Sequence, residues 1–344
     1  MSQRHGRGVV LVTGTEVVPP EASDLIEGRG FTLRAIPDDH LDEAQLHEVL
    51  AGASGYLIGG YEEPGAEHFE RAVDLEAVGW VGTDFRGYVP GWKRAFELGI
   101  AFVSTPGENA VSVAEFTVLL MLGIARPFTA QVITAPGPHD DAPAGDRATP
   151  AGIELHGQTL GIVGAGRIGA RVARVAALGL GMMVLYTAPR RNESLEAALG
   201  LTHVGLDVLL ERSDVVSLHR PGPGRGEPPT IGKPELERVK VGALLVNAGH
   251  PGLVDPVALA WAIEHRDVRA AFDGVGDGDA WTRLASSGPH RFLSMPQMGF
   301  LTRDASLRAG LRAAEAVCDV LSGVDSPSVN NPEFREHRRS RPPA

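Results

Sequence analysis

The chain contains one cysteine, no long hydrophobic run and no apolar leader, and each of these absences excludes a class of protein. Cys318 is the single cysteine among 344 residues, so an intramolecular disulfide is impossible and a reducing cytoplasm is expected. The longest apolar run, 116–125, is too short to cross a bilayer, and residues 1–8 lack a signal-peptide core. We therefore expect a cytoplasmic protein with no membrane partner.

Clusters of basic residues and metal-ligand spacings are also missing. The formal net charge is −11 and Lys and Arg gather only in the tail, 335–344, so a nucleic-acid partner is not expected, because phosphate binding requires clustered cations. The twelve histidines are scattered, and none has a second ligand at metal-binding spacing, so we expect no metal. The tail is interpreted as a solvated terminus, with a binding arm as the alternative.

What the chain does contain is a repeated alternation of β-rich and helical runs. Its 344 residues exceed the usual size of one core, so two domains are expected. Strands are predicted at 9–13, 31–36, 56–58, 77–81 and 100–104, then near Leu160, Met183, Val215, Leu244 and Ala270 and at 292–295; long helices are predicted at 109–126 and 302–321, with an exposed connection at 135–150. This alternation indicates α/β units with parallel strands joined by crossover helices.

The second α/β unit opens on a glycine-rich turn. A predicted strand, 159–163, runs into the pattern G-x-G-x-x-G, and a helix is predicted over 170–178. The first glycine allows the tight turn, the second lets the backbone approach a pyrophosphate, and the third lets the helix pack closely on its strand. The cofactor residues expected in this turn are Gly164, Gly166, Arg167, Ile168 and Gly169. The pattern predicts a nicotinamide dinucleotide site; a turn kept only for packing is the alternative.

The end of the next strand indicates which cofactor is used. An acidic residue about 20 residues beyond the turn usually binds the ribose hydroxyls of NAD. Here the strand ends at Thr187, no carboxylate is present, and Arg190 and Arg191 follow. A hydroxyl group and two cations suit the additional phosphate of NADP. NADP is therefore the expected cofactor, with NAD as the other candidate, and the alternative interpretation is two solvated loop arginines.

Several segments together resemble the D-isomer-specific 2-hydroxyacid dehydrogenase family over most of the chain. They are Gly82-Thr-Asp84, the run from Gly99 to Asn109, Ser112-Val-Ala-Glu115, Glu154 to Gly161, Asp214 to His219, Val246-Asn247, Gly252 to Asp255 and Asn331-Pro-Glu333. The resemblance implies two Rossmann-like domains with parallel sheets, in which a dinucleotide-binding domain, 105–301, is inserted into a discontinuous, flavodoxin-like substrate domain, 1–104 and 302–344. It also implies a small-molecule substrate and a homodimer.

The long predicted helix, 109–126, supports the homodimer. Its apolar stripe consists of Val113, Phe116, Leu119, Leu120 and Gly123. Such a stripe is broader than one helix face usually buries in a small domain, and a second subunit would cover the excess. A helix buried inside its own monomer is the alternative.

The resemblance also assigns site residues by position. The substrate would bind to the backbone of Val81 and Gly82, with Asn109 nearby, and Asp273 would bind the nicotinamide carboxamide. The other expected cofactor residues are His219, Pro221, Asn247 and Gly299. For His219, a satisfied loop histidine is the alternative.

The family's catalytic set is replaced in this chain. Family members place an Arg after Asn-Thr-Ala, where this chain has His250; a Glu three residues after the Asp, where it has Gly276; and a His after Pro, where it has Gln297. His250 can donate a proton or serve as a weak anion contact, whereas Gln297 can orient a carbonyl but cannot transfer a proton near neutral pH. Asp277, beside Gly276, is a candidate replacement for the Glu. The predicted catalytic positions are His250 and Gln297.

Three functions remain open. The first is NADPH-dependent reduction of an unusual 2-oxo acid, ketone or imine. The second is dinucleotide binding for structure or sensing, without catalysis. The third is a non-redox reaction in the cleft that the resemblance implies between the two domains. The intact glycine turn and Asp273 favour retained nicotinamide binding, and therefore the reductase. Replacement of the proton-transfer residues favours the other two.

Overall fold

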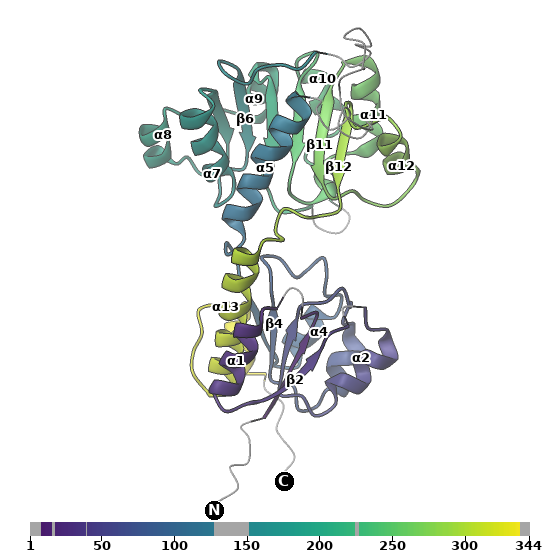
Figure 1. Cartoon of the computed structure of the whole chain (residues 1–344), viewed down its shortest axis with the longest axis vertical. Coiled ribbons are helices and arrows are strands. Elements are labelled where there is room, and N and C mark those ends of the chain that lie inside the picture. Colours follow the sequence, from purple (N-terminus) through teal and green to yellow (C-terminus); the bar gives the residue numbers. More distant parts are fainter. Residues whose placement is uncertain (1–7, 16–17, 39, 127–150, 224–226, 338–344) are drawn as a thin grey trace, which may run out of the picture. The chain divides into compact units, whose positions relative to one another are not determined.

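The computed structural model describes residues 8–15, 18–38, 40–126, 151–223 and 227–337. The chain divides into two compact units, Met1–Asn109 with Leu301–Ala344, and Ala110–Phe300. Each is an α/β body (Figure 1), and every pairing between its strands is parallel. The predicted fold class is thereby confirmed. The predicted connection at 135–150 lies outside the described residues.

The first unit is built on a five-stranded sheet with the order β2-β1-β3-β4-β5. Its elements are β1 (Val9–Thr13), α1 (Pro20–Gly28), β2 (Thr32–Ile36), α2 (Glu43–Leu50), β3 (Gly55–Ile58), α3 (Ala66–Arg71), β4 (Ala77–Trp80), α4 (Trp92–Glu97), β5 (Ala101–Ser104), α13 (Arg303–Leu321) and η4 (Pro332–Arg335). Strands β3 and β5 are buried at every residue, as strands covered on both faces are.

The C-terminal part of the chain completes this first unit. A Cβ at either Gly55 or Gly79 would lie 2.9 Å from a Val317 methyl, so these glycines let α13 pack directly on β3 and β4. Farther on, buried Asn331 accepts a hydrogen bond from the Phe102 N–H and donates one to the Ile100 carbonyl, both at 2.8 Å. The side chain of Asn331 thus pairs backbone groups at the edge strand β5.

The second unit is built on a seven-stranded sheet with the order β12-β11-β10-β9-β6-β7-β8. Its elements are α5 (Ala110–Ala125), β6 (Thr159–Val163), α7 (Gly169–Arg174) continued by the π-helical η2 (Val175–Gly179), β7 (Met183–Thr187), α8 (Glu193–Leu199), β8 (Thr202–His203), α9 (Leu206–Arg212), β9 (Val215–Leu218), α10 (Lys233–Arg238), β10 (Leu244–Asn247), η3 (Pro251–Leu253), α11 (Pro256–His265), β11 (Arg269–Asp273), α12 (Asp279–Ala285) and β12 (Phe292–Met295).

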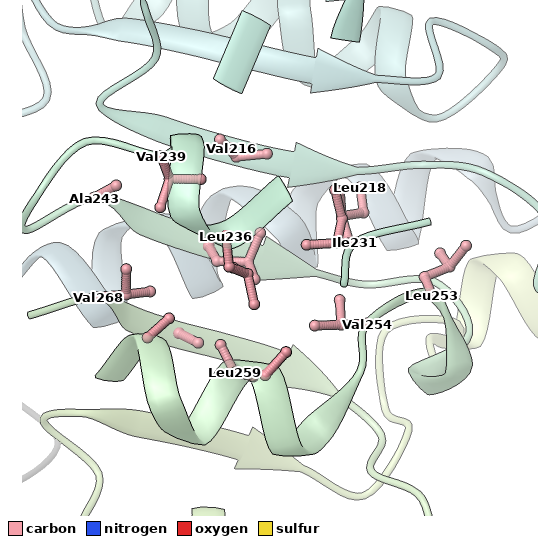
Figure 2. Packing of buried hydrophobic residues seen from close by; sticks show 14 of the residues in the cluster. Val216, Leu218, Ile231, Leu236, Val239, Ala243, Leu253, Val254, Leu259 and Val268 are labelled. Atoms are coloured by element: carbon pink, nitrogen blue, oxygen red, sulfur yellow. The ribbon is translucent and has the colours of Figure 1, made fainter. Parts of the chain in front are cut away.

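Hydrophobic clusters cover both faces of this second sheet. Leu245 belongs to one cluster while its neighbours Leu244 and Val246 belong to the other, because successive strand residues point to opposite faces. Figure 2 shows part of the first cluster, to which Leu218 of β9 and Leu236 of α10 both belong. On the opposite face, α5 supplies Leu120, Met121 and Ile124. The strands are therefore held between two apolar layers.

The predicted elements correspond closely to the observed ones. The strands predicted at 9–13 and 292–295 have the bounds of β1 and β12, and the two long predicted helices are α5 and α13. Thr302 caps α13, because its hydroxyl accepts the Ala305 N–H at 3.2 Å. The two-residue β8 was not predicted, since so short a strand carries no periodic pattern.

Helix α5 is buried more completely than its sequence suggested. Val113, Leu120 and Gly123 are buried and Phe116 is half-buried, whereas Leu119 is 52% exposed. Most of the predicted stripe is therefore buried, and among its five members only Leu119 is left as the excess that a second subunit would cover. Leu119 lies with two further exposed apolar side chains of this helix, Val111 and Leu122.

Among the helices of the described residues, none combines the length and apolar character needed to cross a bilayer. Within the same residues, no three His, Cys, Asp or Glu side chains gather in a way that could hold a metal ion.

Candidate functional site

The carboxyl edge of the seven-stranded sheet carries most of the predicted site residues. From β6 the chain proceeds outward to β7 and β8, and from β9 it proceeds in the opposite direction to β12. Ligands of open α/β sheets bind outside the carboxyl ends of the strands at such a switch point. The glycine turn follows β6 and His219 follows β9, so both lie at the switch between these neighbouring strands.

The three glycines of the turn differ in what surrounds them. Gly164 has φ +102°, and a Cβ there would lie 2.5 Å from the His219 carbonyl oxygen. A Cβ at Gly169 would lie 2.1 Å from the Gly164 carbonyl oxygen. Gly166 is exposed and would have no atom within 4 Å of a Cβ. Packing therefore explains the first and third glycines, whereas the open space at Gly166 fits the approach of a phosphate.

The backbone of the turn also suits an anionic cofactor. The Gly164 N–H donates to the Thr187 carbonyl at 2.9 Å and so ties the turn to the end of β7. The N–H groups of Gly166, Arg167 and Ile168 donate to no other described residue. Unpaired N–H groups leading into a helix form a ready anion site. The residues present thus fit the pyrophosphate of a dinucleotide.

The two arginines beyond β7 are not equivalent. Arg190 is exposed, and its guanidinium has no partner among the described residues. Arg191 is paired with Glu196, its Nη2 lying 2.6 Å from Oε2. The Arg191 guanidinium, followed by the Tyr186 hydroxyl, lowers the pKa of Glu196 to about 2. The sequence treated both arginines as phosphate ligands, but the structure leaves only Arg190 unpaired.

His219 is half-buried at the switch point, and Pro221 beyond it is exposed. The Nε2 of His219 lies 2.8 Å from the Ser217 hydroxyl, and the backbone N–H of His219 donates to the Val163 carbonyl at 2.8 Å. Burial lowers the pKa of His219 to about 4, so the imidazole is neutral at physiological pH. One ring nitrogen is thus satisfied within the protein, and contact with a cofactor stays a prediction for both residues.

Asn247 shapes the turn that presents His250. Buried at the end of β10, Asn247 accepts the Gly249 N–H at 3.0 Å and donates to the His250 carbonyl at 3.1 Å. His250 is exposed, and its Nδ1 accepts the Gly252 N–H at 3.0 Å, which caps η3. With Nδ1 accepting, the neutral ring carries its proton on Nε2. His250 is therefore arranged as a hydrogen-bond donor through Nε2.

The ring of His250 is also held from the side. A Cβ at Gly222, in the loop after β9, would lie 2.6 Å from the His250 Cγ. The imidazole therefore lies directly against backbone that has no side chain. This packing and the η3 cap fix the ring orientation, which is what a catalytic hydrogen-bond donor requires.

Asp273, at the end of β11, holds the loop after β12. It is 5% exposed, and its carboxylate accepts the N–H groups of Met298 at 2.6 Å and Gly299 at 2.8 Å. Burial raises the pKa of Asp273, and these two hydrogen bonds oppose that rise. The Gly299 carbonyl accepts the Ser112 hydroxyl at 2.6 Å. Both oxygens of Asp273 thus serve the fold; its predicted contact with the nicotinamide carboxamide remains a prediction.

Gln297 lies in that same loop in an unusual conformation. Its φ of +55° is left-handed, a region that residues other than glycine seldom adopt. Its side chain lies over Gly274, where a Cβ would be 2.8 Å from the Gln297 Cγ. Residues held in such backbone conformations cluster at functional sites. This strain supports a functional role for Gln297 that the sequence could only infer from position.

A tryptophan occupies the space of the missing family Glu, and the sequence interpretation did not find it. A Cβ at Gly276 would lie 2.6 Å from the Trp281 Nε1. The Trp281 ring packs 5.8 Å from Phe272 and 6.4 Å from Phe292, so it belongs to the core. Asp277 is exposed. The only sequence signal was a glycine followed five residues later by a large aromatic.

The predicted substrate residues lie in the first unit. The Gly82 N–H donates to the Trp80 carbonyl at 2.9 Å, and the Gly82 carbonyl accepts the Thr105 N–H at 2.8 Å. Gly82 also lies against the Trp80 indole, since a Cβ there would be 2.5 Å from Nε1. Val81 and Asn109 are half-exposed. The N–H of Gly82 is therefore already used, and substrate binding by these residues stays a prediction.

Comparison with known proteins identifies relatives over nearly the whole chain. The family model described as D-isomer specific 2-hydroxyacid dehydrogenase, NAD binding domain, matches residues 124–299. A D-3-phosphoglycerate dehydrogenase of Archaeoglobus fulgidus is 31% identical over 333 residues, 93% of this chain and 60% of that protein. A glyoxylate reductase of Aeropyrum pernix is 33% identical over 275 residues, 78% of either chain.

Solved structures agree with these relatives. The crystal structure of the TT0316 protein of Thermus thermophilus matches with a TM-score of 0.77 and 28% identity, over 94% of this chain and 99% of that one. The chain spans little more than half of the phosphoglycerate dehydrogenases that it matches, 60% in Archaeoglobus fulgidus and 54% in Mycobacterium leprae. The chain belongs to the D-isomer specific 2-hydroxyacid dehydrogenase family and contains its NAD-binding domain.

Proposed function

We propose that the protein is an NADPH-dependent reductase of a small carbonyl or imine compound, such as an unusual 2-oxo acid. The observation that carries this proposal is the glycine turn at the switch point, with open space at Gly166 and unpaired N–H groups. Arg190, which has no partner among the described residues, stands beyond β7 where a carboxylate would favour NAD. The nicotinamide supplies hydride when it is bound.

The roles of the chain's own residues follow from their geometry. The Nε2–H of His250 donates a hydrogen bond to the substrate oxygen or nitrogen and polarises it. The Gln297 amide orients the same group from the loop after β12. Neither side chain reproduces the family's proton relay, so the proton that completes reduction comes from water or from the substrate.

The test is NADPH oxidation by the purified protein against a panel of 2-oxo acids, ketones, aldehydes and imines. We expect turnover with at least one class and faster turnover with NADPH than with NADH. A second candidate, a dinucleotide-binding protein without catalysis, is favoured by one observation, the filling of the Glu position by Trp281. A silent panel from protein that binds NADPH would favour that second candidate over the reductase.

Arg190 should contribute to cofactor choice. We expect Arg190→Ala to weaken NADPH binding about five-fold, the effect of one exposed ion pair, and to leave NADH binding unchanged. Fluorescence titration with both reduced cofactors measures the change. Equal loss for both cofactors would show that Arg190 acts on the loop and not on the phosphate.

We also propose a homodimer that covers the exposed face of α5. The apolar side chains exposed there are Val111, Leu119 and Leu122, and burying them in a second subunit is favourable. The double variant Leu119→Glu/Leu122→Glu should sediment as a monomer at micromolar concentration, whereas the native chain should sediment as a dimer. The control is Val241→Glu, at an exposed position on a loop, which should stay dimeric. A monomeric native chain would refute the proposal.

A further inference from the structure

We propose that Glu196 is a specificity-determining residue, which limits the preference for NADPH by holding Arg191 away from the 2′-phosphate. Arg190 alone then meets that phosphate. The inference rests on the proposed use of NADPH and names the residue that tunes it.

The pairing of Arg191 with Glu196 uses the whole carboxylate. The Nε of Arg191 donates to Oε1 at 2.8 Å and to Oε2 at 2.9 Å, and Nη2 donates to Oε2 at 2.6 Å. Such fork-shaped pairs of guanidinium and carboxylate are directional and strong. The Glu196 side chain is 11% exposed, against 61% for Arg191. The carboxylate is thus the fixed partner, and the guanidinium is drawn to it.

Glu196 is held from behind by a buried tyrosine. The hydroxyl of Tyr186, which is fully buried in β7, donates to the Glu196 Oε1 at 2.6 Å and accepts the Asn192 N–H at 2.7 Å. At the other end of the loop, Nε2 of His203 lies 3.2 Å from the Ala188 carbonyl oxygen. The loop 188–192 is therefore held at both ends, and the Tyr186 hydroxyl holds the Glu196 carboxylate in place on α8.

The two arginines of this loop consequently differ in whether their charge is neutralised. Glu196 stays ionised at every physiological pH, because its pKa is about 2, and it neutralises Arg191 locally. Arg190, next in the chain, has no such partner among the described residues and is exposed. A 2′-phosphate arriving at the end of β7 would meet one available cation, although two arginines are present.

The test isolates the 2′-phosphate by calorimetric titration with two probes, 2′,5′-ADP and 5′-AMP, which differ only in that group. Glu196→Gln keeps the size of the side chain but removes its charge, so Arg191 is released. We expect this variant to bind 2′,5′-ADP about five-fold more tightly than the native protein and to bind 5′-AMP unchanged. The control is Glu193→Gln, which removes an exposed charge from the same helix and should have a smaller effect.

Variants of Arg191 show whether this side chain causes the tighter binding. Arg191→Ala by itself should not tighten 2′,5′-ADP binding, because it leaves the Glu196 charge uncompensated. The double variant Glu196→Gln/Arg191→Ala should show no gain over the native protein. No gain in Glu196→Gln, or a gain that persists without Arg191, would overturn the inference. Tyr186→Phe removes only the supporting hydroxyl and serves as a second variant should Glu196→Gln not fold; its gain should have the same direction, and its absence would count against the inference.

These binding measurements are independent of turnover. A silent substrate panel would refute the proposed reductase without affecting them. Native protein that binds 2′,5′-ADP no more tightly than 5′-AMP would refute NADPH use itself, whereas failure of the inference appears only in the Glu196 and Arg191 variants. The two failures are therefore distinguishable.

Discussion

Replacing His250 by asparagine should lower the rate of carbonyl reduction about 100-fold to 1,000-fold, the usual effect of losing one hydrogen-bond donor at a developing negative charge. Nδ1 of His250 accepts the Gly252 N–H at 3.0 Å, which leaves Nε2 as the donor. Asparagine is among the best N-cap residues, so it preserves the acceptor for Gly252. It places no donor where Nε2 stands, and the fold of η3 should be unchanged.

Three variants separate the cap from the chemistry. His250→Asn should lose turnover at nearly native stability; His250→Ala should lose turnover and also about 1 kcal/mol of stability from the missing cap; His250→Gln should recover part of the rate, because its amide reaches farther. Steady-state rates and denaturant unfolding measure both quantities. Native turnover in His250→Asn would assign His250 to the η3 cap alone.

The fold and the position of the site could be predicted because they depend on local patterns. The alternation of strands and helices fixes a parallel sheet, and the carboxyl ends of parallel strands meet at one edge. The strand predicted to end at Thr187 ends there, and His219 and Asn247 likewise stand directly after or at the end of a strand. For the same reason the glycine turn could be placed at the end of its strand from the sequence alone.

The roles of individual side chains could not be predicted, because they depend on which partner each one finds in space. Nothing in the sequence distinguishes Arg190 from Arg191; only the arrangement of β7 and α8 shows that Glu196 pairs with the second. Likewise, the sequence assigned the Asp273 carboxylate to the nicotinamide carboxamide, but in the structure this carboxylate accepts hydrogen bonds from the N–H groups of Met298 and Gly299. Hydrogen-bond partners across loops carry no periodic signal.

The misjudged burial of α5 has the same origin. The sequence argument assumed that a helix packs along one face, so a broad apolar stripe implied a partner subunit. In the structure α5 contacts α7 as well as β10, β11 and β12, and several elements together bury the stripe. The exposed residues Leu119 and Leu122 follow only from that three-dimensional packing.

Restoring two members of the family's catalytic set should raise the reduction of simple 2-oxo acids. We expect the double variant His250→Arg/Gln297→His to exceed the native rate about 100-fold, at the lower end of general acid catalysis. The introduced guanidinium supplies a bidentate charge for the carboxylate, and the introduced imidazole supplies the proton. Histidine is among the residues that tolerate the left-handed backbone found at Gln297, φ +55°.

The pH dependence identifies the introduced acid. Only the protonated form of the introduced imidazole can transfer a proton to the substrate. The rate of the double variant should therefore fall as pH rises through about 6.5. The matched control is His250→Arg/Gln297→Asn, which keeps an amide that also tolerates this backbone but cannot donate a proton; it should show neither the gain nor the fall. A gain shared by that control would attribute the effect to the guanidinium alone.

The third family residue should not be recoverable by a single substitution. Gly276→Glu in the double variant would place a Cβ 2.6 Å from the Trp281 Nε1, in a ring that packs with Phe272 and Phe292. We expect it to lower the free energy of unfolding by about 1–3 kcal/mol, as overpacking does, and to give no further rise in rate. Denaturant unfolding and the 2-oxo acid assay measure these two outcomes. Because Trp281 belongs to the core, its indole leaves no room for the carboxylate that tunes the family's histidine. A Gly276→Glu variant that is faster and equally stable would therefore contradict this account of the site.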